Sequence, residues 1–250
     1  MTMANADTKV ALVTGGAQRI GARLCQALHE AGYDIALHYR SSGVAAEALA
    51  AQLSVLRPRS VTCFQAALGD RSAGEELAAG VIDHLGRVDL LVNNASTFYP
   101  TPIGSVGEED WETIIGSNLK GPFFLCQALA DSLKQSRGNI INMIDIHGER
   151  PLADHSLYST AKAGLAMLTR SLARELAPDV RVNGISPGVI LWPKSDDPED
   201  GERRERQLKR VPLGSEGDPQ DIAEAVLFLA ERAPYVTGQI IAVDGGRSLT

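Results

Sequence analysis

Apolar and polar positions define two kinds of segment along this chain of 250 residues. Short continuous apolar runs, such as residues 9–14, are typical of strands that are buried on both faces of a parallel sheet. Longer segments, in which apolar residues recur three and four positions apart, are typical of helices that bury one face. The two kinds alternate along the chain, which predicts a parallel sheet with helices on both faces.

The expected elements follow from these runs. We expect strands at 9–14, 34–39, 61–65, 88–93, 139–144, 180–185 and 238–243. We expect helices at 17–31, 44–56, 71–85, 109–135, 156–177 and 219–230, the fourth of them broken or bent at Gly121-Pro122. The predicted fold class is α/β, one doubly wound (Rossmann) domain over residues 1–250 with a sheet of about seven strands.

Two segments stand outside this alternation. Residues 1–8 are small and polar and are interpreted as a loose tail, without the charged and then apolar pattern of a signal peptide. Residues 188–212 are charged, contain prolines and show no strand period, so we interpret them as an insertion that forms a substrate loop.

Composition narrows the possible functions. A net charge of −7 without a block of Lys or Arg argues against a nucleic-acid partner, so we expect small-molecule partners. No apolar run reaches the roughly 18 residues of a membrane helix, and we expect a cytoplasmic protein that binds no membrane. Cys25, Cys63 and Cys126 are odd in number and far apart, and the histidines lack metal-ligand spacing. We therefore expect reduced thiols and no metal.

A glycine turn, residues 14–21, joins the first strand to the first helix. Exposed backbone N–H groups and the helix dipole favour a pyrophosphate at such a turn, which makes Gly15, Arg19 and Ile20 candidate cofactor contacts. Arg19 occupies the place of the middle glycine in a Gly-x-x-x-Gly-x-Gly loop, and its guanidinium could reach a phosphate or another anionic group. A purely structural turn is the alternative.

The second strand ends in His38, Tyr39, Arg40 and Ser41, where an NAD site would carry an Asp or Glu for the ribose hydroxyls. No acid is present. Guanidinium, hydroxyl and imidazole donors suit a 2′-phosphate, which favours NADPH over NADH. The alternative is a solvated loop.

The fourth strand ends at the same edge in residues 93–95, where small residues let a cofactor lie against the backbone. Residues 96–102 then form a stiff loop with two prolines, and a flat ring could stack on Phe98. Packing of aromatic side chains within the loop is an equally good interpretation. Asn118 lies on the helix that faces this region, and we interpret it either as support for Lys162 through backbone and water or as a buried helix asparagine.

Tyr158 and Lys162 lie four residues apart on one face of a predicted helix. An ammonium group beside a phenol favours the phenolate and lowers the phenol pKa, which would make Tyr158 an acid–base group. Such pairs also arise by chance. Asp145 ends the fifth strand just before them, and a carboxyl group whose pKa is raised by burial could keep or relay a proton. The alternative is an aspartate that caps the following loop.

Taken together, these residues resemble the short-chain dehydrogenase/reductase family over nearly the whole chain. The matching positions are Thr14, Gly21, Asn93, Ala95, Asn118, Tyr158, Lys162, Pro187, Gly188 and the closing residues 243–246. Within that family the chain is most similar to the pteridine reductases, through Arg19, the residues 38–41, the loop 94–102, and Asp145 where most relatives have a serine.

The resemblance implies an NADPH-dependent reductase of oxidised or dihydro pterins, with dihydrofolate as a further candidate substrate, that assembles as a homotetramer. Tyr158 and Asp145 would deliver a proton, Lys162 would hold the nicotinamide ribose, and the pterin would lie between Phe98 and the nicotinamide. The implied cofactor contacts are Gly15, Arg19, Ile20, His38, Tyr39, Arg40, Ser41, Leu68, Asn93, Ala95, Ser96, Tyr158, Lys162, Pro187, Gly188 and Val189. The implied substrate contacts are Arg19, Ser96, Phe98, Asp145, Tyr158, Leu191 and Trp192.

Two other functions remain open. A carbonyl reductase of a 3-oxoacyl thioester or a small ketone would use the same Tyr158 and Lys162, and Asp145 separates this hypothesis from the first. If the pterin hypothesis is right, Asp145→Ser should shift the preference toward ketones. A non-catalytic NADP-sensing protein would not need Tyr158, Lys162 and Asn118 together, and all three are present.

Overall fold

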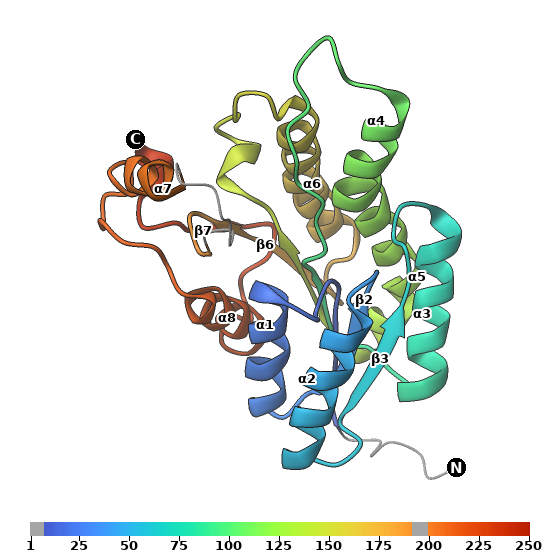
Figure 1. Cartoon of the computed structure of the whole chain (residues 1–250). Coiled ribbons are helices and arrows are strands. Elements are labelled where there is room, and N and C mark those ends of the chain that lie inside the picture. The colour runs from blue at the N-terminus through green and yellow to red at the C-terminus, as the bar shows by residue number, and fades with distance from the viewer. Residues whose placement is uncertain (1–7, 192–199) are drawn as a thin grey trace.

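The computed structural model describes residues 8–191 and 200–250 and contains one parallel sheet of seven strands (Figure 1). The sheet order is β3-β2-β1-β4-β5-β6-β7. The strands are β1 (Val10–Val13), β2 (Asp34–Tyr39), β3 (Val61–Gln65), β4 (Leu90–Asn93), β5 (Asn139–Met143), β6 (Arg181–Pro187) and β7 (Ile240–Val243). The order reverses between β1 and β4, which is where open α/β sheets bind ligands. The predicted α/β, doubly wound fold class is confirmed.

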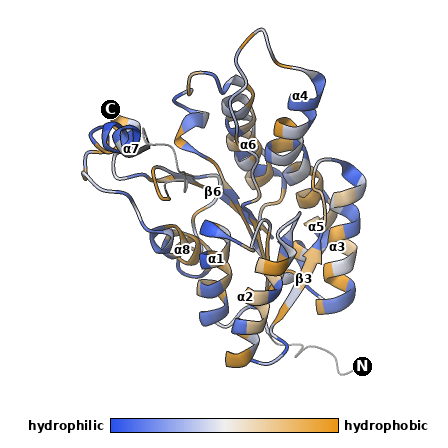
Figure 2. Cartoon of the chain, viewed as in Figure 1, coloured by the Kyte–Doolittle hydropathy of each residue, from blue (hydrophilic) through white to orange (hydrophobic). Residues whose placement is uncertain are grey.

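Helices cover both faces of the sheet, and hydrophobic residues gather where helices meet strands (Figure 2). One face carries α1 (Arg19–Glu30), α2 (Gly43–Leu56) and α8 (Pro219–Leu227). The other carries α3 (Arg71–Leu85), α5 (Gly121–Ser136) and α6 (Ser156–Glu175). Leu24 and Leu28 of α1 and Leu129 of α5 are fully buried in these two layers. In α1, where Leu24 and Leu28 recur at helical spacing, the sequence pattern matches the buried face.

The register of the sheet brings the carboxyl ends of the central strands together. Val13 at the end of β1 pairs with Leu37 in β2 and with Val92 in β4. Asn93 at the end of β4 pairs with Asn142 in β5. The loops that follow β1, β2, β4 and β5 consequently leave the sheet at one edge, and this edge holds the glycine turn, the loop after β4 and Asp145.

The long fourth helix consists of three parts rather than one bent helix. α4 (Glu108–Ile115) leads into a π-helical turn, η1 (Gly116–Lys120), which continues directly into α5. The N–H of Gly121 bonds to the carbonyl of Gly116, five residues earlier, and Pro122 lies in the first turn of α5. The predicted irregularity is therefore confirmed, but its main part lies before Gly121. A widened turn of this kind inserts one extra residue into a helix.

The segment 188–212 contains a helix that the sequence did not predict, α7 (Asp200–Leu208). Glu202 and Arg206 lie one helical turn apart and form an ion pair at 3.7 Å, and Glu205 and Lys209 form another at 2.8 Å. Such pairs support a polar helix that has no apolar periodicity to reveal it. Of the predicted loose tail, residues 1–7 lie outside the described residues.

The remaining turns are 3-10 helices, η2 (Ile146–Gly148) after β5 and η4 (Arg247–Leu249) after β7, and a π-helical turn, η3 (Phe228–Arg232), after α8. Within residues 8–191 and 200–250, no helix is both long and apolar enough to cross a membrane. The same residues contain no cluster of three metal-ligating side chains. Cys25, Cys63 and Cys126 are free thiols.

Candidate active site

The glycine turn after β1 is held tightly by its own backbone and by Asn94. Gly15 has a φ of +62°, in the left-handed region that glycine adopts without strain. The Nδ2 of Asn94 donates to the carbonyl of Thr14 at 2.9 Å and to that of Gly15 at 3.1 Å. A Cβ on Gly21 would lie 2.1 Å from the Gly15 carbonyl oxygen, so only glycine fits there. The turn therefore leaves no space between itself and the first helix.

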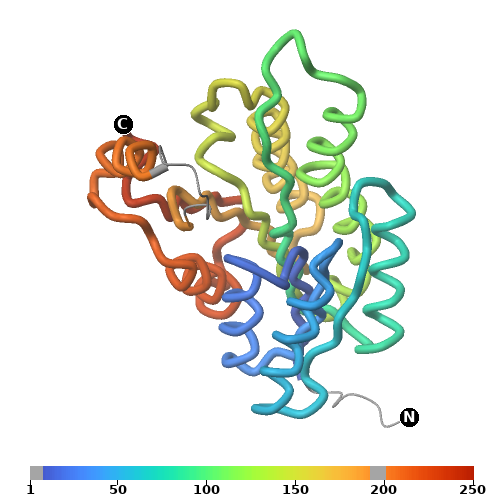
Figure 3. The backbone as a smooth tube through the Cα atoms, in the orientation of Figure 1, coloured from blue at the N-terminus to red at the C-terminus, as the bar shows by residue number. Residues whose placement is uncertain are grey.

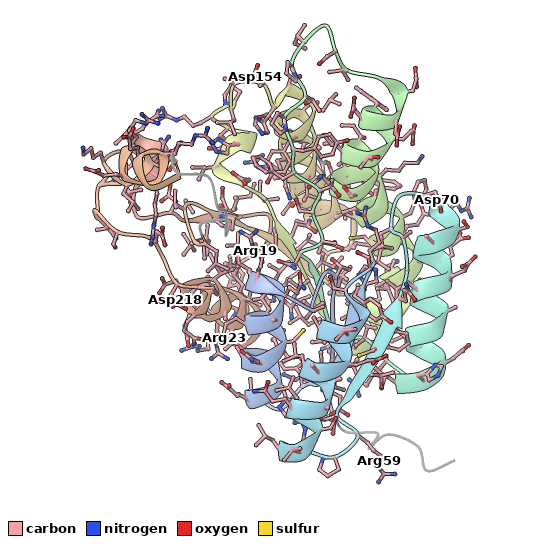
Figure 4. The ribbon with its side chains drawn as sticks, in the orientation of Figure 1. Arg19, Arg23, Arg59, Asp70, Asp154 and Asp218 are labelled. Carbon is pink, nitrogen blue, oxygen red and sulfur yellow. The ribbon has the colours of Figure 1, made fainter. Side chains whose placement is uncertain are left out.

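The first turn of α1 is open and positively charged. Arg19, labelled at this end of α1 in Figure 4, is exposed, and its Nη2 donates to the carbonyl of Leu191 at 3.1 Å. Gln18 precedes the helix without a side-chain cap, and the first turn carries no acidic residue. A helix N-terminus with uncapped N–H groups and a neighbouring guanidinium suits a phosphate. The residues present thus fit a dinucleotide cofactor at this turn.

His38 corrects one expectation. Its side chain is only 2% exposed, its Nδ1 accepts from the N–H of Gly15 at 3.2 Å, and its Nε2 donates to the carbonyl of Ala66 at 3.1 Å. Burial lowers its pKa to about 4, so the ring is neutral. Because both ring nitrogens are used, the prediction that this imidazole donates to a phosphate is wrong. His38 instead holds the glycine turn.

The other residues after β2 remain available. Tyr39 is half-buried, and Arg40 and Ser41 are exposed. Within the described part of the chain the Arg40 guanidinium takes part in no ion pair, although its carbonyl accepts from Gln65 at 3.1 Å. Residues 38–41 themselves contain no acid that would repel a 2′-phosphate. Arg40 and Ser41 stay candidate phosphate contacts.

Residues at the end of β4 hold the glycine turn after β1 in place and also lie where a ligand could bind. The Nδ2 of Asn93 donates to Asn142 at 2.8 Å, and the side chain is 3% exposed, so it braces the sheet. The N–H of Ala95 donates to the Oγ1 of Thr14 at 2.9 Å. Thr14 and Asn94 were not among the predicted contacts, although both stand inside the motifs that the sequence shows. Leu68, after β3, is half-buried and packs against the helical layer.

Asn118 in η1 anchors the loop after β4. Its Nδ2 donates to the carbonyl of Thr97 at 2.9 Å, and its Oδ1 accepts from the hydroxyl of Ser96 at 2.8 Å. The side chain is 1% exposed. The same amide also donates to Ile114 and Ser117 of its own helical segment, so Asn118 fixes the loop with Phe98 to this segment. Its support of Lys162 through backbone and water stays a prediction.

Asp145 and Tyr158 form a direct pair. The hydroxyl of Tyr158 donates to the Oδ2 of Asp145 at 2.7 Å, and the Oδ1 of Asp145 accepts from the N–H of His147 at 2.9 Å. One oxygen thus caps η2, which confirms the interpretation of Asp145 as a loop cap, while the other accepts from the phenol. The proton relay through Asp145 stays a prediction. Tyr158 is 5% exposed and Asp145 is half-buried.

The pKa of Tyr158 is raised in this structure rather than lowered, which corrects the expectation that Lys162 brings it below its usual value. Burial raises the Tyr158 pKa above its usual value, and the negative charge of Asp145 raises it further. Lys162 is itself buried; its Nζ donates to the carbonyl of Met143 at 2.9 Å and lies 5.5 Å from the Tyr158 ring centre. Burial lowers the pKa of Lys162 to about 8. Tyr158 therefore keeps its proton at neutral pH.

Phe98 forms a wall beside Tyr158 that involves a residue the sequence did not reveal. Its ring stacks on that of His155 at 4.6 Å between centres and meets the Tyr158 ring edge-on at 4.8 Å. The loops meet again where the N–H of Thr101 donates to the carbonyl of Asp154, which Figure 4 labels in the loop before α6, at 2.5 Å. Phe98 is 53% exposed, so part of its surface stays open.

The end of β6 approaches the edge from the other side. The N–H of Gly188 donates to the carbonyl of Val243 at 3.0 Å, and a Cβ on Gly188 would lie 2.7 Å from the Cα of Asp244. Pro187 and Val189 beside it are half-buried. Leu191 is 36% exposed and meets Arg19, while the predicted contact Trp192 lies outside the described residues.

Comparison with known proteins agrees with this geometry. Residues 15–248 match the model of a family described as enoyl-(acyl carrier protein) reductase. Pteridine reductase 1 of Leishmania tarentolae is 37% identical over 282 aligned positions, which cover 96% of each chain. The 3-oxoacyl-(acyl-carrier-protein) reductase of Staphylococcus aureus is 37% identical over 244 positions, 96% of this chain and 98% of its own. That of Thermotoga maritima is 34% identical over 246 positions, with the same coverage. The chain thus belongs to the short-chain dehydrogenase/reductase family of oxidoreductases, which use nicotinamide cofactors.

Proposed function

We propose that this oxidoreductase is an NADPH-dependent pteridine reductase, which reduces a C=N bond of oxidised or dihydro pterins and takes dihydrofolate as a candidate further substrate. The observation that carries the proposal is the 2.7 Å hydrogen bond from Tyr158 to Asp145. Reduction of C=N needs a proton on nitrogen as hydride reaches carbon, and a carboxyl group beside a protonated phenol can deliver it. The pteridine reductase at 37% identity supports the same substrate class.

The side chains divide this work. Tyr158 holds a proton because its pKa is raised, and Asp145 fixes the orientation of that hydroxyl through the contact with the N–H of His147. Lys162, with a pKa of about 8, stays mostly protonated at neutral pH. Its charge beside the Tyr158 ring stabilises the negative charge that develops when the phenol gives up its proton. The nicotinamide cofactor, when bound, supplies the hydride.

The preference for NADPH rests on charge. Arg19 at the first turn of α1 and Arg40 after β2 are exposed guanidiniums near the expected phosphates. Guanidinium binds phosphate through paired hydrogen bonds, and a carboxylate at the end of β2 would repel a 2′-phosphate. The chain has donors there and no acid.

A 3-oxoacyl thioester reductase is the second candidate. The Staphylococcus aureus relative has the same 37% identity, and the matching family model carries an acyl carrier protein in its description. This reaction would use Tyr158 and Lys162 equally well. What argues against it is Asp145, because a ketone needs only a hydroxyl donor at that position to polarise its oxygen, and a charged carboxylate would repel that oxygen as it becomes negative.

Loss of nicotinamide absorbance separates the two candidates. Purified protein would be given NADPH or NADH with biopterin, dihydrobiopterin, dihydrofolate or an acetoacetyl thioester. We expect pterin turnover with NADPH that Asp145→Ala abolishes, and a shift toward the thioester in Asp145→Ser. The exposed Asp83→Ala on α3 serves as the control. Turnover of the thioester alone, with Asp145→Ala unaffected, would refute the pterin assignment.

Assembly and compartment remain predictions. The homotetramer implied by the family resemblance is supported by Trp111, Phe123 and Met167, which expose apolar side chains on α4, α5 and α6. Light scattering on a size-exclusion column would test it. Three free thiols suit a reducing compartment such as the cytoplasm.

A further inference from the structure

A histidine that takes no part in the proposed proton delivery lies beside Tyr158. His155 immediately precedes α6, three positions before Tyr158, and its carbonyl accepts from the N–H of Ser159 at 2.9 Å. Residues three apart in a helical turn lie on the same face, roughly 4.5 Å apart along the axis. Both rings also contact Phe98, His155 by stacking at 4.6 Å between centres and Tyr158 edge-on at 4.8 Å. The imidazole is therefore a neighbour of the phenol that holds the proton.

Contacts between two loops fix the position of His155. Thr101, in the loop after β4, forms a parallel bridge with His155, and its N–H donates to the carbonyl of Asp154 at 2.5 Å. Figure 3 shows this loop, in green, passing beside the yellow segment that leads into α6. Asp154 has a φ of +58°, a conformation that is uncommon for residues other than glycine and persists only where the surrounding structure maintains it. The backbone thus holds the imidazole against Phe98.

Only one nitrogen of the His155 ring is engaged. Nδ1 donates to the carbonyl of Ala153 at 2.7 Å, and because a carbonyl can only accept, Nδ1 carries a proton. In the neutral ring the second nitrogen, Nε2, then has a free lone pair and is an acceptor. Among residues 8–191 and 200–250, no group donates to this Nε2.

The stack on Phe98 determines where Nε2 points. The planes of the two rings are inclined by only 17°, and the lone pair of a ring nitrogen lies in the plane of its ring. Nε2 therefore points past the edge of Phe98 rather than into its face. It also lies on the side of the imidazole away from Nδ1 and the Ala153 carbonyl. The ring is half-buried, which leaves part of it open to a ligand.

The side chain of a dihydropterin begins next to the bond that is reduced. The remaining C=N bond of such a pterin includes the ring carbon that carries the side chain, while its nitrogen receives the proton. Tyr158 and Asp145 would deliver that proton, so the side chain starts directly beside them. A group one helical turn from Tyr158 is consequently placed to contact the side chain rather than the ring.

We propose that His155 is a specificity-determining residue, whose Nε2 accepts a hydrogen bond from a hydroxyl on the side chain of the pterin. The inference rests on the proposed function and identifies the pterins that it favours, which are those with a hydroxyl close to the ring, as in biopterin. Aromatic stacking alone would recognise the flat ring system and would not distinguish a hydroxylated side chain from a methyl group.

Two substitutions separate the hydrogen bond from the stack. His155→Phe keeps an aromatic ring against Phe98 and removes Nε2, whereas His155→Gln removes the ring and keeps an acceptor at a similar distance from the backbone. Wild type and both variants would be given dihydrobiopterin and 6-methyldihydropterin, whose side chain has no donor. We expect His155→Phe to raise the KM for dihydrobiopterin about three- to tenfold, as for the loss of one hydrogen bond, with kcat unchanged. Its KM for the methyl compound should stay as in wild type, and His155→Gln should keep the wild-type ratio of the two KM values.

His84→Phe is the matched control. The Nδ1 of His84 also donates to a carbonyl, that of Gly80 at 2.9 Å, and its ring also meets a phenylalanine, Phe64, at 5.8 Å between centres. His84 lies in the last turn of α3, shortly before β4 begins and thus at the edge of the sheet opposite Tyr158. Both KM values should therefore be unchanged in this variant.

Three outcomes would overturn the hydrogen bond while leaving the reductase assignment intact. Equal KM changes for the two pterins in His155→Phe would show that the imidazole contributes only packing. Unchanged KM values for both would show that it contributes nothing to substrate binding. An identical KM ratio in His155→Gln and His155→Phe would show that the acceptor is not what matters. A wild type that reduces no pterin would overturn the proposed function and this inference together.

Calorimetric titration supplies a readout that does not depend on turnover. Biopterin should bind His155→Phe about three- to tenfold more weakly than wild type, while 6-methylpterin should bind both proteins alike. If His155→Phe folds less completely, the ratio of the two dissociation constants remains the test, because a loss of folded protein affects both ligands equally. An unchanged ratio would contradict the proposal.

Discussion

The two halves of the catalytic edge are built by different means. Around β1 and β2 the structure relies on backbone shape, with Gly15 and Gly21 in a turn that admits no side chain and a neutral His38 that serves only backbone groups. Around β5 and α6 it relies on titratable side chains, because Tyr158 and Lys162 are buried and both have displaced pKa values. Substitutions in the first half should therefore affect stability and cofactor affinity, whereas those in the second should affect rate.

The largest expected effect lies in the second half. Tyr158→Phe removes the donor to Asp145 and should lower kcat by about 10²- to 10⁴-fold, the usual contribution of a general acid. NADPH affinity, measured by fluorescence titration, should change little. Tyr33→Phe is the matched control, because it removes the bond from a buried tyrosine to Glu231 at the opposite edge of the sheet. If the Tyr158→Phe enzyme kept more than a tenth of wild-type activity, the expectation that substitutions around β5 and α6 act mainly on the rate would be wrong.

An intermediate effect should come from His38 and should appear in stability. Its pKa is about 4 in the folded protein against an ordinary 6.5, so between these values the unfolded chain binds a proton that the folded one does not. Stability is then full above pH 6.5 and falls as the pH drops toward 4, by about 3 kcal/mol in total. Urea unfolding of wild type and His38→Gln from pH 4 to 7 should show a shallower slope in the variant. His84→Gln, exposed on α3, should keep the wild-type slope.

The smallest effect should come from the surface of the cofactor half. Arg40→Ala should raise the KM for NADPH about tenfold and leave that for NADH unchanged, because only NADPH carries the 2′-phosphate. Arg174→Ala, exposed at the far end of α6, is the control. Equal losses with both cofactors would place the phosphate contact elsewhere, and Arg19 would be the next candidate.

Much of this arrangement is local in sequence and could be predicted. Continuous apolar runs identified the strands, and the position of Asp145 after an apolar run placed it at a strand end. The pairing of Asp145 with Tyr158 was implied only by the resemblance to the pteridine reductases, and the structure shows the hydrogen bond between them at 2.7 Å. The glycines of residues 14–21 likewise predicted the turn between the first strand and the first helix.

The rest depends on contacts between distant segments. A histidine next to a strand end looks like a donor, and only burial against Ala66 and Gly15 shows that His38 is already satisfied. The raised pKa of Tyr158 likewise depends on how much water the fold removes. The stacking of His155 on Phe98 joins residues that are 57 positions apart in the sequence, and no spacing rule finds such a pair.

At the π-helical turn η1, the number of residues in the segment matters as much as which residues they are. One extra residue there turns everything that follows by about 100° relative to an uninterrupted helix. The turn lets Asn118 reach Thr97 while Leu125 and Leu129 of α5 still meet the sheet. If a single residue between 116 and 120 were deleted, Asn118 could bond to the loop that carries Phe98, or the apolar face of α5 could pack against the sheet, but both contacts could not form together. A relative whose alignment has a gap at this place should therefore have a different path of the loop after β4, even if it retains Phe98, Asp145, Tyr158 and Lys162.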